Sequence, residues 1–107
     1  MRSKLRYYSA LYTSEGITGK ELGRIKNMLE KKPLRAGVYL ITAAPNPHDQ
    51  LEIFRSGLLA QQYYQNNPPY IIGITQNYEE AIHIVEQIVR DCLEERGDCG
   101  LKEYLTC

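Results

Sequence analysis

His48 and the polar residues around it are the first candidates for chemistry in this chain. His48 lies in the stretch "TAAPNPHDQL", residues 42–51, directly after an apolar run that predicts a buried strand. A neutral imidazole at the carboxyl end of a strand could serve as a general base or as a ligand. Asn46 could cap the helix expected to follow and face the same space. Catalysis also needs a nucleophile or an acid within reach of the base, and the pattern of this stretch supplies no such partner.

Polar side chains also follow the other two apolar runs of the chain. Ser14 comes directly after the first run, and the sequence "TQN", residues 75–77, ends the third. In a parallel sheet, right-handed crossovers bring the carboxyl ends of the strands to one edge, and ligands of open α/β sheets bind there. The pattern assigns no catalytic residue, and the candidate ligand-binding residues are Ser14, Asn46, His48, Thr75, Gln76 and Asn77.

Neither a metal site nor a cofactor site is predicted. Cys92, Cys99 and Cys107 include no pair separated by two residues, the spacing that is typical of zinc sites. The loop "SEGITGK" has two glycines and a lysine but lacks the four intervening residues of a phosphate-binding loop. Each expected helix start carries its own carboxylate, which weakens the attraction of a helix N-terminus for phosphate.

The charge balance and the length of the chain narrow its partners. Thirteen basic residues balance thirteen acidic residues among 107, so no net field attracts a polyanion and nucleic acid is not an expected partner. No stretch approaches the roughly 20 apolar residues of a membrane span. The basic N-terminal residues are not followed by the apolar region of a signal peptide. We therefore expect a single soluble, cytoplasmic domain over residues 1–107, with no membrane partner.

The alternation of apolar runs with amphipathic segments predicts an α/β fold. Strands are expected at residues 6–13, 37–43 and 70–75, forming a small, mainly parallel three-stranded sheet in a β-α-β-α-β-α order with packed helices. Residues 101–106, "LKEYLT", could add a short fourth strand at the C-terminus. Two strand orders remain open. The order 2-1-3 would place a crevice beside the first and third strands, whereas 1-2-3 would leave one face for a partner subunit or the C-terminal tail.

Capping residues and apolar spacing predict the first two helices. Thr18 and Glu21 form a capping box for the first. The second is expected after Asn46, which is followed by proline at the first helical position. Its buried face would begin with Leu51, Phe54 and Leu58.

The third helix, at residues 78–96, has the clearest pattern. Asn77 caps its start and Gly97 ends it. His83 lies on the polar face, so we expect it to meet solvent. The apolar stripe expected to face the core consists of Tyr78, Ala81, Ile82, Val85, Ile88, Val89, Cys92 and Leu93.

The lack of a catalytic constellation, together with nine tyrosines and no charge bias, favours a non-enzymatic binding or regulatory domain. Tyrosine is enriched at protein interfaces, so the leading hypothesis is a homo-oligomer or a module that binds a protein partner. The alternative is a small enzyme or small-molecule carrier with its site at the carboxyl ends of the strands. The segment "QQYYQNNPP", residues 61–69, is expected to be a helix end followed by a proline-fixed loop, with a contact surface as its second interpretation.

Overall fold

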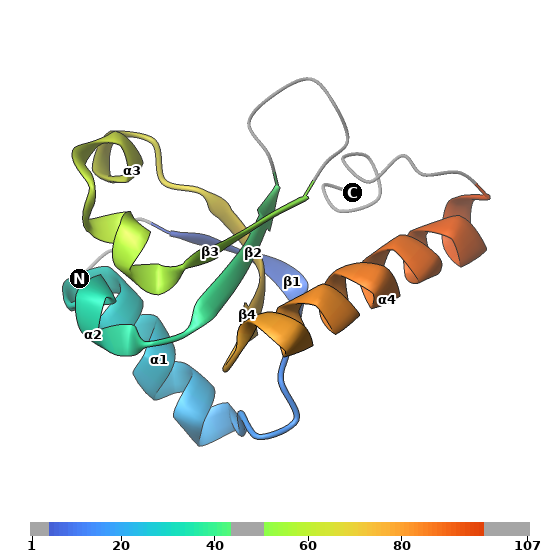
Figure 1. Ribbon diagram of the computed structural model, residues 1–107, viewed down its shortest axis with the longest axis horizontal. Helices are drawn as coiled ribbons and strands as arrows, with labels where there is room; N and C mark the ends of the chain where they lie inside the picture. The colour runs from blue at the N-terminus through green and yellow to red at the C-terminus, as the bar shows by residue number, and fades with distance from the viewer. Residues whose placement is uncertain (1–4, 44–50, 98–107) are drawn as a thin grey trace.

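The chain forms a mixed α/β fold, seen in a computed structural model that describes residues 5–43 and 51–97 (Figure 1). Within these ranges a four-stranded sheet is accompanied by four α-helices and one 3-10 helix, η1. The elements in chain order are β1 (Arg6–Thr13), α1 (Gly19–Lys31), α2 (Pro33–Ala36), β2 (Tyr39–Ala43), β3 (Leu51–Arg55), η1 (Ser56–Ala60), α3 (Gln62–Asn66), β4 (Tyr70–Thr75) and α4 (Tyr78–Arg96).

The strands lie in the order β1-β4-β2-β3. β1 and β4 are parallel, whereas β2 is antiparallel to both of its neighbours, β4 and β3. The predicted α/β class and the bounds of β1 and β4 are therefore confirmed. The prediction of a mainly parallel three-stranded sheet fits only in part, because β1 and β4 are parallel but β2 runs in the opposite direction and a further strand pairs with it. Neither predicted strand order is observed, because β4 lies between β1 and β2.

That further strand, β3, occupies part of the segment where the sequence predicted the second helix. Leu51 and Phe54 are three residues apart, which fits a helix. Leu51 and Ile53 are two residues apart, which fits one face of a strand. The pairing with β2 selects the strand, with Ala43 opposite Leu51 and Tyr39 opposite Arg55. Leu58, the third residue of the predicted helix face, lies in η1. The predicted strand at residues 101–106 lies outside the described residues.

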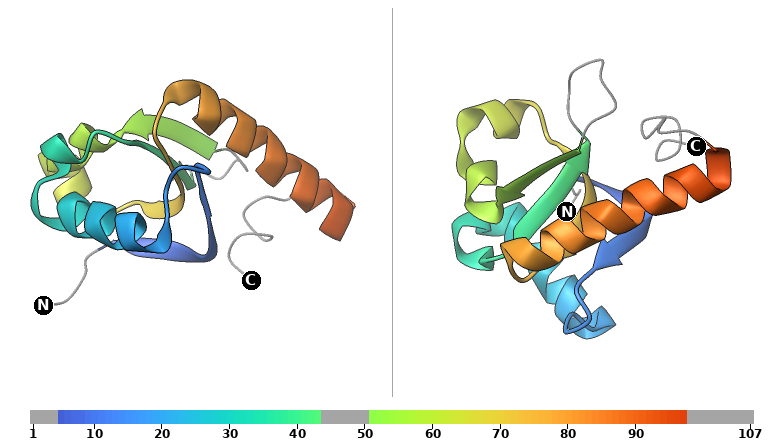
Figure 2. Two further views of the ribbon diagram at one scale, coloured as in Figure 1. Left: turned by 90° about the horizontal axis from the view of Figure 1, so that it is seen from below. Right: turned by 45° about the vertical axis from the view of Figure 1, so that its right-hand side comes forward.

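Two layers of helix enclose the sheet unequally. α1, α2, η1 and α3 cover one face, where Ile25 and Leu29 of α1 pack against Leu40, Ile71 and Ile74. On the other face, α4 is the helix that the described residues supply. It packs its Ala81, Ile88 and Cys92 on Ile41 and Ile72. Figure 2 shows α4 apart from the other helices, with its last turns extending beyond the strands.

The predicted N-caps Thr18 and Asn77 and the predicted helix end at Gly97 are confirmed. Thr18 accepts a hydrogen bond from the Glu21 backbone N–H at the start of α1. Asn77 accepts one from the Glu80 N–H at the start of α4, and Gly97 ends that helix in the left-handed conformation with φ of 79°. The segment 61–69 also follows its prediction, because the short helix α3 is followed by two prolines. No helix in the described ranges is long and apolar enough to cross a bilayer.

Candidate functional site

The carboxyl ends of β1 and β4 bring Ser14 next to the backbone of Gln76. Because these strands are parallel neighbours, the residues that follow them meet at one edge of the sheet. The Ser14 hydroxyl accepts a hydrogen bond from the Gln76 N–H at 3.0 Å, and the Ser14 N–H donates to the Ile74 carbonyl at 3.2 Å. The Ser14 side chain is buried. It therefore links the two strand ends and holds the chain as it turns from β4 into α4.

Thr75 and Asn77 complete this bracing. The Thr75 hydroxyl donates to the Asn77 carbonyl at 3.0 Å, while the Asn77 side chain caps α4. The Gln76 amide lies over Gly16, where a Cβ would come within 3.2 Å of its oxygen. Four of the candidate ligand-binding residues thus come together, but three of them bond to neighbouring backbone groups. The hydrogen bonds of these side chains hold the two strand ends and the start of α4 together.

Asn46 and His48, the other two candidates, lie outside the described residues. Their flanking residues, Ala43 and Leu51, form the last pair of the β2–β3 ladder. Thr42, the residue before Ala43 in β2, pairs with Ile71 near the start of β4. This is the end of the sheet opposite to Ser14, because β2 is antiparallel to β4. The parallel strand direction, on which the grouping of all six candidates depended, is not observed for β2.

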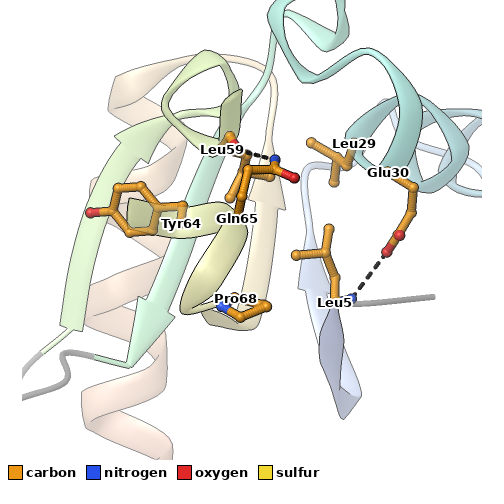
Figure 3. Close-up of a pocket in the computed structure, with 7 residues that line it drawn as sticks. All are labelled: Leu5, Leu29, Glu30, Leu59, Tyr64, Gln65 and Pro68. Carbon is orange, nitrogen blue, oxygen red and sulfur yellow. Dashed lines mark hydrogen bonds between the residues drawn. The ribbon is translucent and has the colours of Figure 1, made fainter. Parts of the chain in front are cut away.

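A small cavity that is partly open to solvent lies between the start of β1, the end of α1 and the η1–α3 segment (Figure 3). Its volume is about 30 Å³, which suits about one water molecule rather than a metabolite. Two hydrogen bonds border it: the Leu5 N–H donates to the Glu30 carboxylate at 3.1 Å, and the Gln65 amide donates to the Leu59 carbonyl at 2.6 Å. The cavity is lined by Leu5, Leu29, Glu30, Leu59, Tyr64, Gln65 and Pro68.

A much larger groove runs beside β3, and we call it the β3 groove. Its volume of about 770 Å³ falls in the range of known ligand sites. Leu34 on α2 is 76% exposed and forms part of one wall. The complete lining consists of Leu34, Gly37, Tyr39, Ile53, Phe54, Arg55, Ser56, Gly57, Leu58, Ala60 and Gln61. The sequence did not point to this groove, because its floor was expected to be helical.

A second apolar surface lies along one side of α4. Tyr78 is 51% exposed, Ile82 39% and Leu93 43%. Val85 and Val89 lie between them and are half-buried. These five residues are the α4 flank. The predicted stripe of eight residues therefore divides. Ala81, Ile88 and Cys92 are buried against the sheet, Val85 and Val89 are half-buried beside them, and Tyr78, Ile82 and Leu93 are left at the surface. The signal was present in the sequence, since eight apolar residues cover a wider arc of a helix than one contact face needs.

Within residues 5–43 and 51–97, no group of three or more His, Cys, Asp and Glu side chains is placed to hold a metal ion. His83 is exposed on the polar side of α4, as expected.

Comparison with protein-family models, curated proteins and solved structures finds no match for this chain.

Proposed function

We propose that this chain is a non-enzymatic, self-associating protein-interaction domain, and that two copies pair through the α4 flank. The observation that carries the proposal is the exposure of three large apolar side chains, Tyr78, Ile82 and Leu93, on one side of a 19-residue helix. Exposed apolar residues gathered in one patch are typical of interaction sites, whereas scattered ones are ordinary.

The spacing along the flank suits a second helix. The apolar positions follow one another at intervals of four, three, four and four residues from Tyr78 to Leu93, close to the alternation of three and four that forms the seam between paired helices. From Ile82 to Leu93 the flank extends for about 16 Å. A helix from another molecule could therefore lie along three turns of α4.

The residue order on the flank is self-complementary for an antiparallel pair. With a two-fold axis between residues 87 and 88, Ile82 lies opposite Leu93 of the partner subunit. The same axis pairs position 85 with position 90 and position 89 with position 86, so Val85 lies one residue out of register with the partner's Val89. Glu86 and Arg90 are exposed beside the flank, and the same axis places Glu86 within one residue of the partner's Arg90, so their opposite charges lie close together. A two-fold interface needs this kind of self-match, because one surface must recognise itself.

The alternative, an enzyme or carrier using the strand-end edge, has less support. Ser14, Thr75 and Asn77 at that edge bond to neighbouring backbone groups, so these three side chains are already engaged in the fold.

Sedimentation velocity across a concentration series tests the proposal with two matched variants. Ile82→Glu places a charge in the seam, whereas His83→Glu places the same charge one residue away, on the polar side of α4. Each Ile82 side chain is expected to contribute about 1 kcal/mol to the pair. The loss counts twice in a two-fold interface, so Ile82→Glu should weaken dimerisation at least about thirtyfold.

The wild type and His83→Glu should dimerise equally, with a Kd near or below about 50 µM. A wild-type chain that stays monomeric up to about 500 µM, or two variants that behave alike, would contradict the proposal.

A further inference from the structure

We infer that the β3 groove binds an extended polypeptide segment, which adds to the sheet as a strand beside β3. The segment would carry apolar side chains at alternate positions and a carboxylate near Arg55. This inference goes beyond the proposed function, because it does not depend on pairing through α4.

The hydrogen-bond pattern of the β2–β3 ladder determines which backbone groups of β3 point toward the groove. The Ser56 N–H donates to the Val38 carbonyl at 2.9 Å, which extends the ladder by one pair beyond Tyr39 and Arg55. In an antiparallel ladder, bonded and non-bonded pairs alternate. Phe54 and Glu52 therefore direct their N–H and C=O groups toward β2. Ile53 and Arg55 direct theirs outward, and both residues line the groove.

β3 is the last strand on its side of the sheet among the described residues. A row of outward N–H and C=O groups at a sheet edge is the template that strand addition uses. The groove therefore offers main-chain bonds to an extended chain, which a compact ligand would not use.

The two sides of the groove match the two faces of an added strand. Leu34, Leu58 and Phe54 lie on the side of α2 and η1, and they form an apolar wall. Tyr39 and Ile53 lie on the α4 side of the sheet. Successive side chains of a strand point to opposite faces, so alternate apolar residues of the bound segment would pack on the first wall.

The positive charge of Arg55 determines which side chain the bound segment would carry on its other face. The Arg55 guanidinium lies over the Tyr39 ring, 5.9 Å from its centre. The side chain of Arg55 is exposed, and the lining contains no Asp or Glu. A carboxylate on the bound segment, on the face that meets Tyr39 and Ile53, would pair with this guanidinium.

A second copy of β3 would fit this site less well. Antiparallel pairing of two β3 strands about Ile53 would place Leu51 opposite Arg55 and Glu52 opposite Phe54. Arg55 would then face a leucine, and Glu52 would face the apolar wall. The charge pattern therefore favours a different polypeptide segment.

NMR titration of the full chain tests the inference, using the acetylated and amidated pentapeptide Leu-Glu-Leu-Thr-Leu as the probe. The Ile82→Glu variant is titrated in parallel, so that any pairing through α4 is separated from peptide binding. Binding should saturate with a Kd below about 1 mM in both proteins. At saturation, amide hydrogen exchange should slow at Ile53 and Arg55 and stay unchanged at Glu52 and Phe54.

Charge reversal tests the role of Arg55. The peptide Leu-Lys-Leu-Thr-Leu should bind the wild type about fivefold more weakly, and Arg55→Glu should reverse that preference. Lys20→Glu makes the same charge change on the exposed start of α1 and should leave the preference intact. Thermal melts of both variants verify that they are folded.

Three results would overturn the inference. They are the absence of saturable binding, equal protection of inward and outward amides at saturation, and a peptide preference that Arg55→Glu does not alter. Protection of Ile53 and Arg55 that rises with protein concentration without peptide would assign the edge to a second copy instead.

Discussion

At the scale of single residues, Tyr7 shows how a side chain can be well packed and still carry a cost. Its ring packs in the core beside α1, with the Lys26 ammonium 4.6 Å from the ring centre. Its buried hydroxyl has no hydrogen-bond partner among the described residues. Burial, followed by the charge of Glu30, raises the pKa of Tyr7 to about 12. The neutral form is therefore the one that the fold accommodates.

The raised pKa of Tyr7 predicts a loss of stability in alkali. The unfolded chain releases this proton near pH 10, before the folded chain does. The stabilisation is thus fully present below pH 10 and is lost as the pH rises to about 12. Because the side chain is partly exposed, we expect a loss of about 1 kcal/mol. Urea unfolding at pH 8 and pH 11 should show that Tyr7→Phe loses less stability than the wild type. Equal losses would contradict this account.

The candidate site shows which contacts could be predicted from the sequence and which could not. The order of strands and turns indicated that Ser14 and residues 75–77 would meet, and they do meet at the ends of β1 and β4. That the Ser14 hydroxyl would accept the Gln76 N–H at 3.0 Å could not be predicted. This contact depends on the positions of the two strand ends to within a few tenths of an ångström, and residue types do not encode that precision.

At the scale of elements, local chemistry predicted some features correctly and failed in the segment that contains β3. The caps of α1 and α4 and the apolar run of β4 depend on neighbouring residues, and all are confirmed. The direction of β2 depends on which strand it meets, and an apolar run such as "YLITA" fits parallel and antiparallel neighbours alike. β3 has five residues, too few for its alternation to outweigh the helical spacing of Leu51 and Phe54.

The pairing of β2 with β4 predicts a specific coupling between two core positions. A Cβ added at Gly73 would lie 3.0 Å from the Ile41 Cδ1 atom. Gly73→Ala should therefore cost about 1–3 kcal/mol of unfolding free energy, and Ile41→Val about 1 kcal/mol. The double variant should cost about 1 kcal/mol less than the sum, because valine lacks the Cδ1 atom. Urea denaturation of the four proteins measures this. Strict additivity would argue against the observed register.

At the scale of the whole molecule, the unequal covering of the sheet connects the fold to the proposal. Among the described residues, four helical segments cover one face, and α4 lies on the other with an apolar side left exposed. The sequence analysis predicted that one face of the sheet could be left for a partner subunit if the strand order were 1-2-3, and that order is not observed. The exposed flank arises instead because the apolar arc of α4 is wider than its contact with the sheet.

The most direct test of self-association exploits the two-fold arrangement of Glu86 and Arg90. Glu86→Arg and Arg90→Glu each bring like charges close together at two points of the interface. Each variant alone should dimerise about tenfold more weakly than the wild type. An equimolar mixture restores opposite charges at both points, so sedimentation velocity should show dimers in the mixture at concentrations where each variant alone is monomeric. A mixture that sediments as the separate variants do would contradict pairing through α4.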